Sequence, residues 1–177
     1  MAAPLLLLGV VLAGCTTDEP GNATAGTTTA GTSAAATTTK SVPTTTASSG
    51  PSLADVKTCD IYRELASQLG LSKIEQADKD SCYADVSASE SVQFDLHPDK
   101  GLADYVKNAQ TEVSETTVNG RKALLAKKAL TSTSCVVAIE VTAKSRVDFV
   151  GTSNDSLDKS CENAQKVAKA VEPKLPK

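Results

Sequence analysis

Residues 134–151, with the sequence SCVVAIEVTAKSRVDFVG, decide the fold, because they predict two consecutive strands with a short connection. In the first strand, apolar side chains recur at every second position and share one face: Cys135, Val137, Ile139 and Val141. A turn near Lys144 and Ser145 leads into the second strand. The other predicted elements are arranged around this pair.

Four more strands are predicted before this pair. Residues 81–86 (SCYADV) form a short strand, and residues 91–97 (SVQFDLH) alternate apolar and polar side chains like a half-buried strand. Residues 112–129 (EVSETTVNGRKALLAKKA) form a hairpin, because Asn119 and Gly120 supply the positive φ angles of a type I′ turn.

Three segments have the apolar spacing of helices. Residues 58–71 end at Gly70 and place three side chains inward: Ile61, Leu65 and Leu69. Residues 99–110, with Asp99 as the N-cap, are expected to place four inward: Leu102, Tyr105, Val106 and Ala109. Residues 156–177 carry an apolar stripe before Pro173: Leu157, Cys161, Ala164, Ala168 and Val171.

The predicted order is helix, two strands, helix, four strands, helix. Consecutive strands without strand–helix–strand alternation favour an antiparallel sheet covered by helices. We therefore predict an α+β single domain over residues 53–177, with a mainly antiparallel sheet of about six strands and about three helices. Aromatic residues make up only 3% of the chain, so the core must consist of smaller aliphatic side chains.

Four of the five cysteines fall in this domain and predict two disulfides, although three pairings are possible. Cys59 opens the first helix and Cys82 begins the first strand. Cys161 lies on the apolar stripe of the last helix, and Cys135 lies on a strand that this helix can cover. We predict Cys59–Cys82 and Cys135–Cys161.

The N-terminus resembles the signal of a bacterial lipoprotein. The apolar run 5–13 is too short to span a membrane, and it is followed by Leu12-Ala13-Gly14-Cys15, which is similar to a lipobox. We predict a signal peptide over residues 1–14 and lipidation of Cys15; ordinary cleavage after Ala13 is the alternative. No Lys or Arg precedes Leu5, so we interpret Met1 as lying downstream of the true start.

Residues 15–52 predict a lipidated cysteine followed by a disordered linker rich in Thr, Ala and Ser. With Val42 as the single large apolar residue of residues 16–52, this segment cannot bury enough surface to fold. An O-glycosylated linker and an unmodified one are both compatible with its composition. The expected location is the outer face of the bacterial cytoplasmic membrane, through the lipid anchor.

Composition and motifs argue against several classes of activity. The net charge is −3, so the chain lacks the basic surface that nucleic-acid binding requires, and we expect no nucleic-acid partner. The chain has no C-x-x-C pair and a single histidine, His97, which predict no metal site and no cofactor. His97 is interpreted as a solvated residue beside Pro98, and Asp78, Asp80 and Asp85 as solvated carboxylates. We therefore expect no enzymatic activity. If the protein were an enzyme after all, a hydrolase would be the class considered, and it is less favoured than a binding function.

The motifs CDIYRELASQLGL, VNGRKA, SCVVAIEV and SCENAQKVAKAVEPKLP, together with the lipobox, resemble an actinobacterial lipoprotein family of unknown function, domain of unknown function 3558. The resemblance covers nearly the whole chain and implies export and disulfides, but no catalytic residues. The chain departs from the family pattern at Tyr83 and Ala84. The order of elements is also similar to lipoproteins of the Mog1/PsbP type, by analogy.

The expected function is a non-catalytic binding or interaction module of the cell envelope, monomeric, with an envelope protein, glycan or lipid as its partner. The alternative is a small lipophilic-ligand carrier or sensor. Its candidate pocket lies under the last helix: Leu157, Ala164, Val167, Ala168 and Val171. The alanines of this stripe, Ala164 and Ala168, favour close packing of helix on sheet over a pocket. Lys122, Lys127 and Lys128 are candidates for contact with anionic groups.

Overall fold

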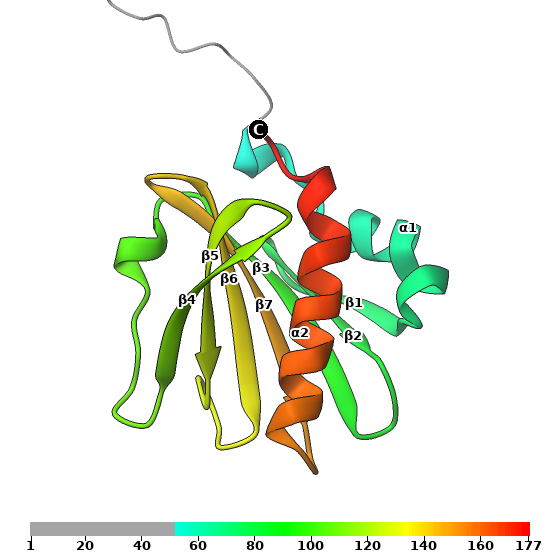
Figure 1. Ribbon diagram of the computed structural model, residues 1–177. Coiled ribbons are helices and arrows are strands. Elements are labelled where there is room, and N and C mark those ends of the chain that lie inside the picture. Colours follow the sequence, from blue (N-terminus) through cyan, green and yellow to red (C-terminus); the bar gives the residue numbers. More distant parts are fainter. Residues whose placement is uncertain (1–51) are drawn as a thin grey trace, which may run out of the picture. The chain divides into compact units, whose positions relative to one another are not determined.

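The computed structural model describes residues 52–177, so the predicted signal peptide, Cys15 and nearly all of the predicted linker lie outside the described residues. The described chain forms one sheet of seven antiparallel strands in the order β1-β2-β3-β7-β6-β5-β4 (Figure 1). The strands are β1 Ser72–Asp78, β2 Ser81–Asp85, β3 Glu90–His97, β4 Glu112–Val118, β5 Arg121–Lys127, β6 Ser134–Thr142 and β7 Ser145–Ser153. Two α-helices, α1 Thr58–Leu69 and α2 Leu157–Val171, pack on one face of this sheet. Three short 3₁₀ turns complete the structure: η1 Leu53–Asp55, η2 Leu102–Asp104 and η3 Glu172–Lys174.

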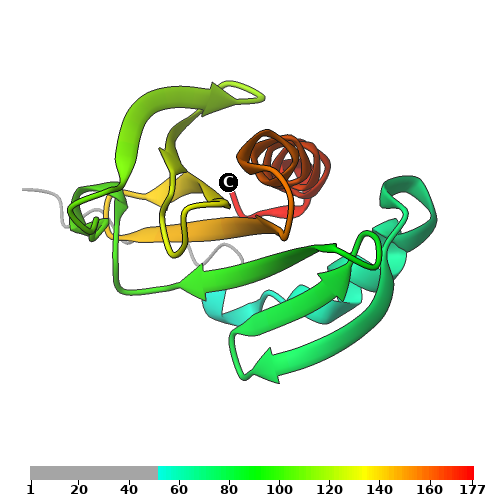
Figure 2. The same ribbon diagram turned by 90° about the horizontal axis from the view of Figure 1, so that it is seen from below.

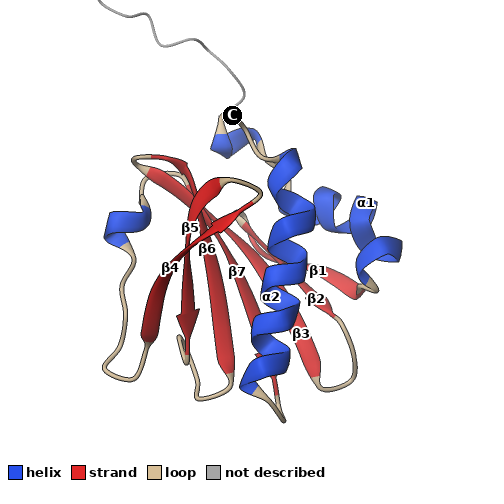
Figure 3. Ribbon diagram, in the orientation of Figure 1, coloured by secondary structure: helices blue, strands red, loops and turns tan. Residues whose placement is uncertain are grey.

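The hairpin β6–β7 lies near the centre of the sheet, as its alternating apolar residues require. In β6, every residue from Ser134 to Ile139 is buried, because α2 covers one face and the segment around η2 shields part of the other. Figure 3 shows α2 lying across the sheet, and Figure 2 shows β4 curling out of the plane of the central strands toward α2. No described helix is long and apolar enough to cross a membrane.

The core under the helices is centred on three of the chain's five aromatic rings. The ring of Tyr62 in α1 lies 5.7 Å from that of Phe94 in β3, and Phe94 stacks on Phe149 in β7 at 4.8 Å. Aliphatic side chains from both helices and the central strands surround these rings. The few large side chains are therefore concentrated where α1 and the sheet meet.

Gly151 in β7 lets α2 approach the sheet at backbone distance. A Cβ atom at this position would overlap the carbonyl oxygen of Ser160 and crowd the backbone nitrogen of Ala164. Cys135 pairs with Gly151 across the β6–β7 ladder, and Cys135 forms a disulfide with Cys161 of α2. A close backbone contact and a covalent link thus hold α2 at neighbouring points.

Both disulfides join the pairs expected from the sequence. Cys59–Cys82 ties the start of α1 to β2, with 5.1 Å between the Cα atoms, and Cys135–Cys161 ties β6 to α2, with 4.9 Å. The two cysteines are 23 residues apart along the chain in Cys59–Cys82 and 26 residues apart in Cys135–Cys161.

The predicted strand count was one too low, because β1 was missed. This strand forms one edge of the sheet, and six of its seven residues are exposed, with Ile74 half-buried. A strand with so little burial lacks the alternation of apolar side chains from which strands are recognised in a sequence. Its backbone bonds to β2, rather than its side chains, define it.

The helix predicted over residues 99–110 was wrong, so the domain has two α-helices rather than three. The segment contains only the turn η2; Leu102 and Tyr105 are half-buried, whereas Val106 is 88% exposed and Ala109 is also exposed. Gly101 packs against the backbone of Ala143, and its carbonyl oxygen accepts a hydrogen bond from Arg146. These long-range contacts override the local helical spacing.

We expect Gly151→Ala to destabilise the domain by about 1–3 kcal/mol, because the added methyl group must displace α2 from β7. Thermal unfolding followed by circular dichroism measures the change. Gly120→Asn is the comparison: no atom lies near an added Cβ there, so it should cost only the strain of a side chain at a φ of +91° and destabilise the domain less than Gly151→Ala does. Equal melting temperatures for Gly151→Ala and the wild type would contradict the close contact.

We expect the double variant Cys135→Ala/Cys161→Ala to lose about 3–4 kcal/mol of unfolding free energy, because the unfolded chain is no longer cross-linked. Denaturant titration measures the loss. Adding a reductant to the double variant should lower its stability only through opening of the remaining disulfide, Cys59–Cys82. A non-reduced peptide map that linked Cys82 to Cys135 would contradict the pairing seen in the structure.

Candidate functional site

The pocket expected under the last helix is filled by the core. Ala164, Val167, Ala168 and Val171 are buried, with at most 2% of any side chain exposed, and they pack in the main core cluster. Leu157 is half-buried at the start of α2. The alanines of α2 therefore serve close packing of helix on sheet, the second of the two interpretations that the sequence allowed.

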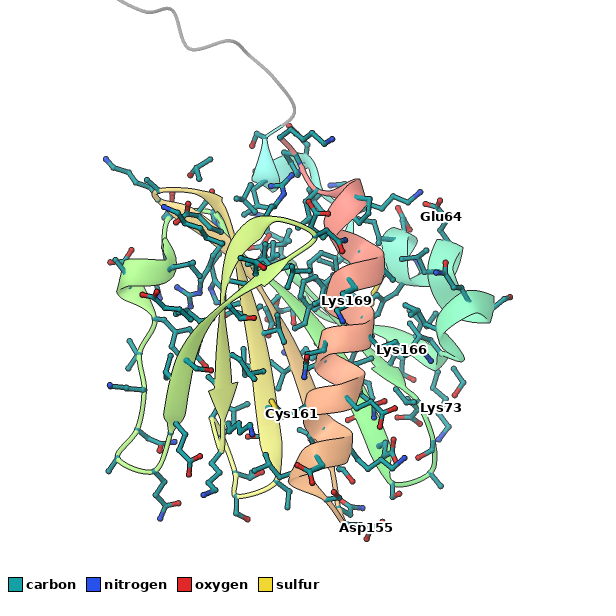
Figure 4. All side chains as sticks on the ribbon, in the orientation of Figure 1. Glu64, Lys73, Asp155, Cys161, Lys166 and Lys169 are labelled. Carbon is teal, nitrogen blue, oxygen red and sulfur yellow. A yellow bond between two sulfur atoms is a disulfide. The ribbon has the colours of Figure 1, made fainter. Side chains whose placement is uncertain are left out.

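A groove lies beside α2 instead of beneath it, with a volume of about 740 Å³. We call it the helix-side groove, and its lining comes from the end of α1, from β5 and from the exposed side of α2: Leu69, Leu125, Lys127, Cys161, Gln165, Lys166 and Lys169. Figure 4 labels Cys161, Lys166 and Lys169 along α2. The Lys166 ammonium donates to the carbonyl oxygen of Leu69 (3.2 Å), while Lys127 and Lys169 form no ion pair with any described residue.

A second hollow of about 750 Å³ lies on the opposite face of the sheet, between η2 and the hairpin β4–β5. We call it the turn-side hollow. Leu102 and Ala103 form one wall. The other wall comes from the strands and carries two carboxylates and one lysine beside uncharged side chains: Glu115, Thr117, Lys122, Leu124 and Glu140. The hairpin β4–β5 is therefore flanked by a depression on each face.

The outer strand of this hairpin, β4, is an edge strand of the sheet. Among the described strands β4 pairs with β5 alone, in a regular register from Glu112 opposite Lys127 to Val118 opposite Arg121. Residues 114–117 are all exposed. An edge of this kind presents unpaired backbone N–H and C=O groups to any extended chain that reaches it.

The tip of this hairpin is fastened to the C-terminal end of α2. The Asn119 side-chain amide donates to the carbonyl oxygen of Lys169 (2.9 Å), and Arg121 Nε lies 2.6 Å from a carboxylate oxygen of Glu172. A second nitrogen of Arg121 donates to the carbonyl oxygen of Pro176 (2.7 Å). These contacts hold the tip of the hairpin against the C-terminal end of α2.

Four charged or ionisable side chains meet on the turn-side face of β3 and β7. Arg146 donates two hydrogen bonds to Asp148 (2.8 and 3.1 Å), and His97 Nε2 lies 3.0 Å from the same carboxylate. The guanidinium carbon of Arg146 also lies 5.3 Å from the centroid of the Tyr105 ring. His97 is therefore held by Asp148 and is half-buried, contrary to its interpretation as a solvated residue. Arg146 and Asp148 were not foreseen.

Asp95 is the fourth member of this group and stands directly opposite Asp148. Burial raises the pKa of its carboxyl; the hydrogen bonds from Ser81 and Gln93 act in the opposite direction, and the charge of Asp148 raises it further. Asp95 also lines a hollow of about 510 Å³ with the predicted solvated residues Asp78 and Asp80. The arrangement therefore places a carboxyl with a raised pKa beside His97.

The remaining candidates from the sequence lie apart from one another. Asp85 pairs with Lys73 (2.9 Å), whose hydrogen bond, with that of Tyr83, lowers the pKa of the aspartate. Lys128 pairs with Glu112 (2.6 Å). Lys122 and Lys127 line depressions on opposite faces of β5, so the three lysines do not form one patch.

Sequence reasoning identified the hairpin of β4 and β5 but not its position at the edge of the sheet. The polar run Ser114-Glu115-Thr116-Thr117 was the available signal, because four consecutive polar residues in a strand indicate that both faces are open. The partner strands, and hence the free edge, follow only from the topology.

We expect Asp95→Asn to raise the melting temperature at neutral pH by a few degrees, since about 1 kcal/mol corresponds to roughly 4 °C in a domain of this size. The raised pKa means that the folded state binds the proton more tightly than the unfolded state does. This stabilisation is complete below the ordinary aspartate pKa and is lost as the pH rises through the pKa of the folded state. The Asn variant should keep its stability over that interval.

Melting curves between about pH 3 and pH 7 test this, and the advantage of the variant should vanish at the acidic end. Asp85→Asn is the control, because the pKa of Asp85 is lowered and its removal should bring no gain at neutral pH. A destabilised Asp95→Asn at pH 7 would contradict the assignment.

Comparison with known proteins gives one match. The model of a family described as "Protein of unknown function (DUF3558)" matches residues 10–174. A search of curated proteins and a search of solved structures found no match to the chain.

Proposed function

The chain belongs to the DUF3558 family, and we propose that it is a lipid-anchored, extracytoplasmic binding module that holds a partner at the hairpin β4–β5. The observation that carries the proposal is the edge strand β4, which pairs with β5 alone among the described strands and lines the turn-side hollow, while its neighbour β5 also lines the helix-side groove. Backbone groups at an edge supply affinity, and adjacent depressions supply selectivity among side chains.

The anchor belongs to the same proposal. Leu12-Ala13-Gly14-Cys15 has the small residues and the thiol that a lipobox requires, and two disulfides suit an exported domain. Tethering to the outer face of the cytoplasmic membrane raises the effective concentration of a partner at that surface without any new contact. An actinobacterial envelope is the setting that the resemblance in the sequence implies.

The proposal gives the module no catalytic role and no cofactor. His97, the single histidine of the chain, is bound to Asp148 and adjoins the packed segment around η2 through Arg146. This arrangement supports a positioning role for the cluster. A turnover screen that found hydrolysis abolished by His97→Ala would replace the binding proposal with an enzymatic one.

The second candidate, a carrier of small lipophilic ligands, draws on the helix-side groove with its aliphatic Leu69 and Leu125. Native mass spectrometry of the full chain, purified from its own host, separates the two. A bare protein mass, together with cross-links from a partner protein to β4 or β5, supports the binding module. A co-purifying lipid that protects the groove would favour the carrier.

We expect Cys15→Ser to release the protein from the membrane fraction into the medium, because a lipid anchor with two or more acyl chains holds far more strongly than a single chain. Fractionation followed by intact-mass analysis measures both location and lipid. Thr16→Ser is the control and should stay membrane-bound. An unmodified Cys15 in a membrane-bound protein would overturn the anchor.

A further inference from the structure

We infer that β4 binds an extended segment of another polypeptide by β-strand addition, as an eighth strand of the sheet. This inference rests on the proposed binding function and names the class of partner and the backbone groups that recognise it.

The turn between β4 and β5 determines which groups of β4 face outward. Asn119 and Gly120 have φ angles of +50° and +91°, as a two-residue type I′ turn requires. The flanking pair Val118 and Arg121 then exchanges both backbone hydrogen bonds, and such pairs alternate with pairs that exchange none. The residues of β4 that direct their N–H and C=O groups away from β5 are Val113, Glu115 and Thr117.

The two edges of the sheet differ in their suitability. The edge strand β1 has two register irregularities and a positive φ at Lys73 (+46°), features that disrupt a straight template. The ladder of β4 has no irregularity over seven consecutive pairs. A regular edge without a bulge keeps its outward N–H and C=O groups in line, so β4 is the better template for an added strand.

The flanking charges define the side chains that an added strand should carry. On the turn-side face it meets Glu115, with Glu140 and Lys122 nearby, which favours a positive side chain. On the other face the curl of β4 directs the added strand toward α2 (Figure 2), where Lys169 and Gln165 lie. The alternating faces of a strand therefore fit a segment in which basic residues alternate with acidic or hydroxyl residues.

A second copy of this chain fits the edge less well. The symmetric antiparallel register that would pair all three outward residues places Glu115 directly opposite Glu115 of the other copy. Like charges directly opposite in a ladder are destabilising. The occupant is therefore a different polypeptide.

The test uses the full chain with Cys15→Ser and a display library of random peptides of about nine residues, the length of a long strand. Enriched peptides should lose about tenfold or more in affinity toward Glu115→Pro and toward Thr117→Pro, since each removes one outward N–H without breaking the bonds to β5. Glu115→Ala and Thr117→Ser keep the N–H, so each should lose less affinity than the proline variant at the same position, and the loss in Glu115→Ala should be confined to peptides with a basic residue facing it.

Amide hydrogen exchange of the unmodified β4 supplies a readout that does not depend on folding of the proline variants. A bound peptide should slow exchange at Glu115 and Thr117 and leave Ser114 and Thr116 unchanged, because the latter already bond to β5. Peptides that bind the proline variants equally, or that perturb Gln165 and Lys169 without protecting Glu115, overturn strand addition. So does a library that yields no binder.

Sedimentation of the full chain completes the test. A dimer that dissociates in Glu115→Pro would identify a second copy as the occupant and overturn the present assignment, whereas a monomer supports it. Binding mapped to another face would overturn strand addition and leave the proposed binding function standing. A lipid that co-purifies with the protein would instead overturn the proposed binding function in favour of a lipid carrier.

Discussion

The contact between α2 and the hairpin β6–β7 is the constraint on which the rest of the domain depends. Gly151 admits the backbone of α2 at Ser160, and the Cys135–Cys161 disulfide fastens the same region covalently. Since the chain contains few aromatic residues, a wide core of large side chains is not available to hold helix and sheet apart. Small residues on both elements, Gly151, Ala164 and Ala168, allow them to touch, and the van der Waals contact of closely packed backbones replaces the missing bulk.

The position of α2 in turn shapes the candidate binding surface. Asn119 and Arg121 attach the tip of the β4–β5 hairpin to Lys169, Glu172 and Pro176 at the end of α2. Because the hairpin is bound at its tip and is open along its edge, β4 curls over the helix instead of continuing the flat sheet (Figure 2). The helix-side groove lies between β5 and the exposed side of α2, so both of its walls belong to elements that the contacts at the hairpin tip hold together.

The opposite face of the sheet is organised by Arg146. Its guanidinium donates to Asp148 and to the carbonyl oxygen of Gly101, and it lies over the ring of Tyr105. One buried cation therefore neutralises a buried carboxylate and fixes the segment around η2, which forms a wall of the turn-side hollow. Asp95 lies opposite Asp148 and forms no ion pair with any described residue; burial raises the pKa of its carboxyl, and the charge of Asp148 adds to this.

Local patterns were sufficient to predict α1 and α2 from their apolar spacing, the hairpin at Asn119 and Gly120 from the required φ angles, the strands with one buried face, and the two cysteine pairs from the elements on which they lie. These depend on interactions between residues close in the chain or on periodic burial. Tertiary structure alone decided that residues 99–110 form a turn, that the exposed segment Ser72–Asp78 is a strand, and that β4 ends the sheet. The packing of Gly101 on Ala143, the pairing of β1 with β2 and the order of strands all join residues distant in sequence, and no local pattern encodes which distant partner a backbone group will meet.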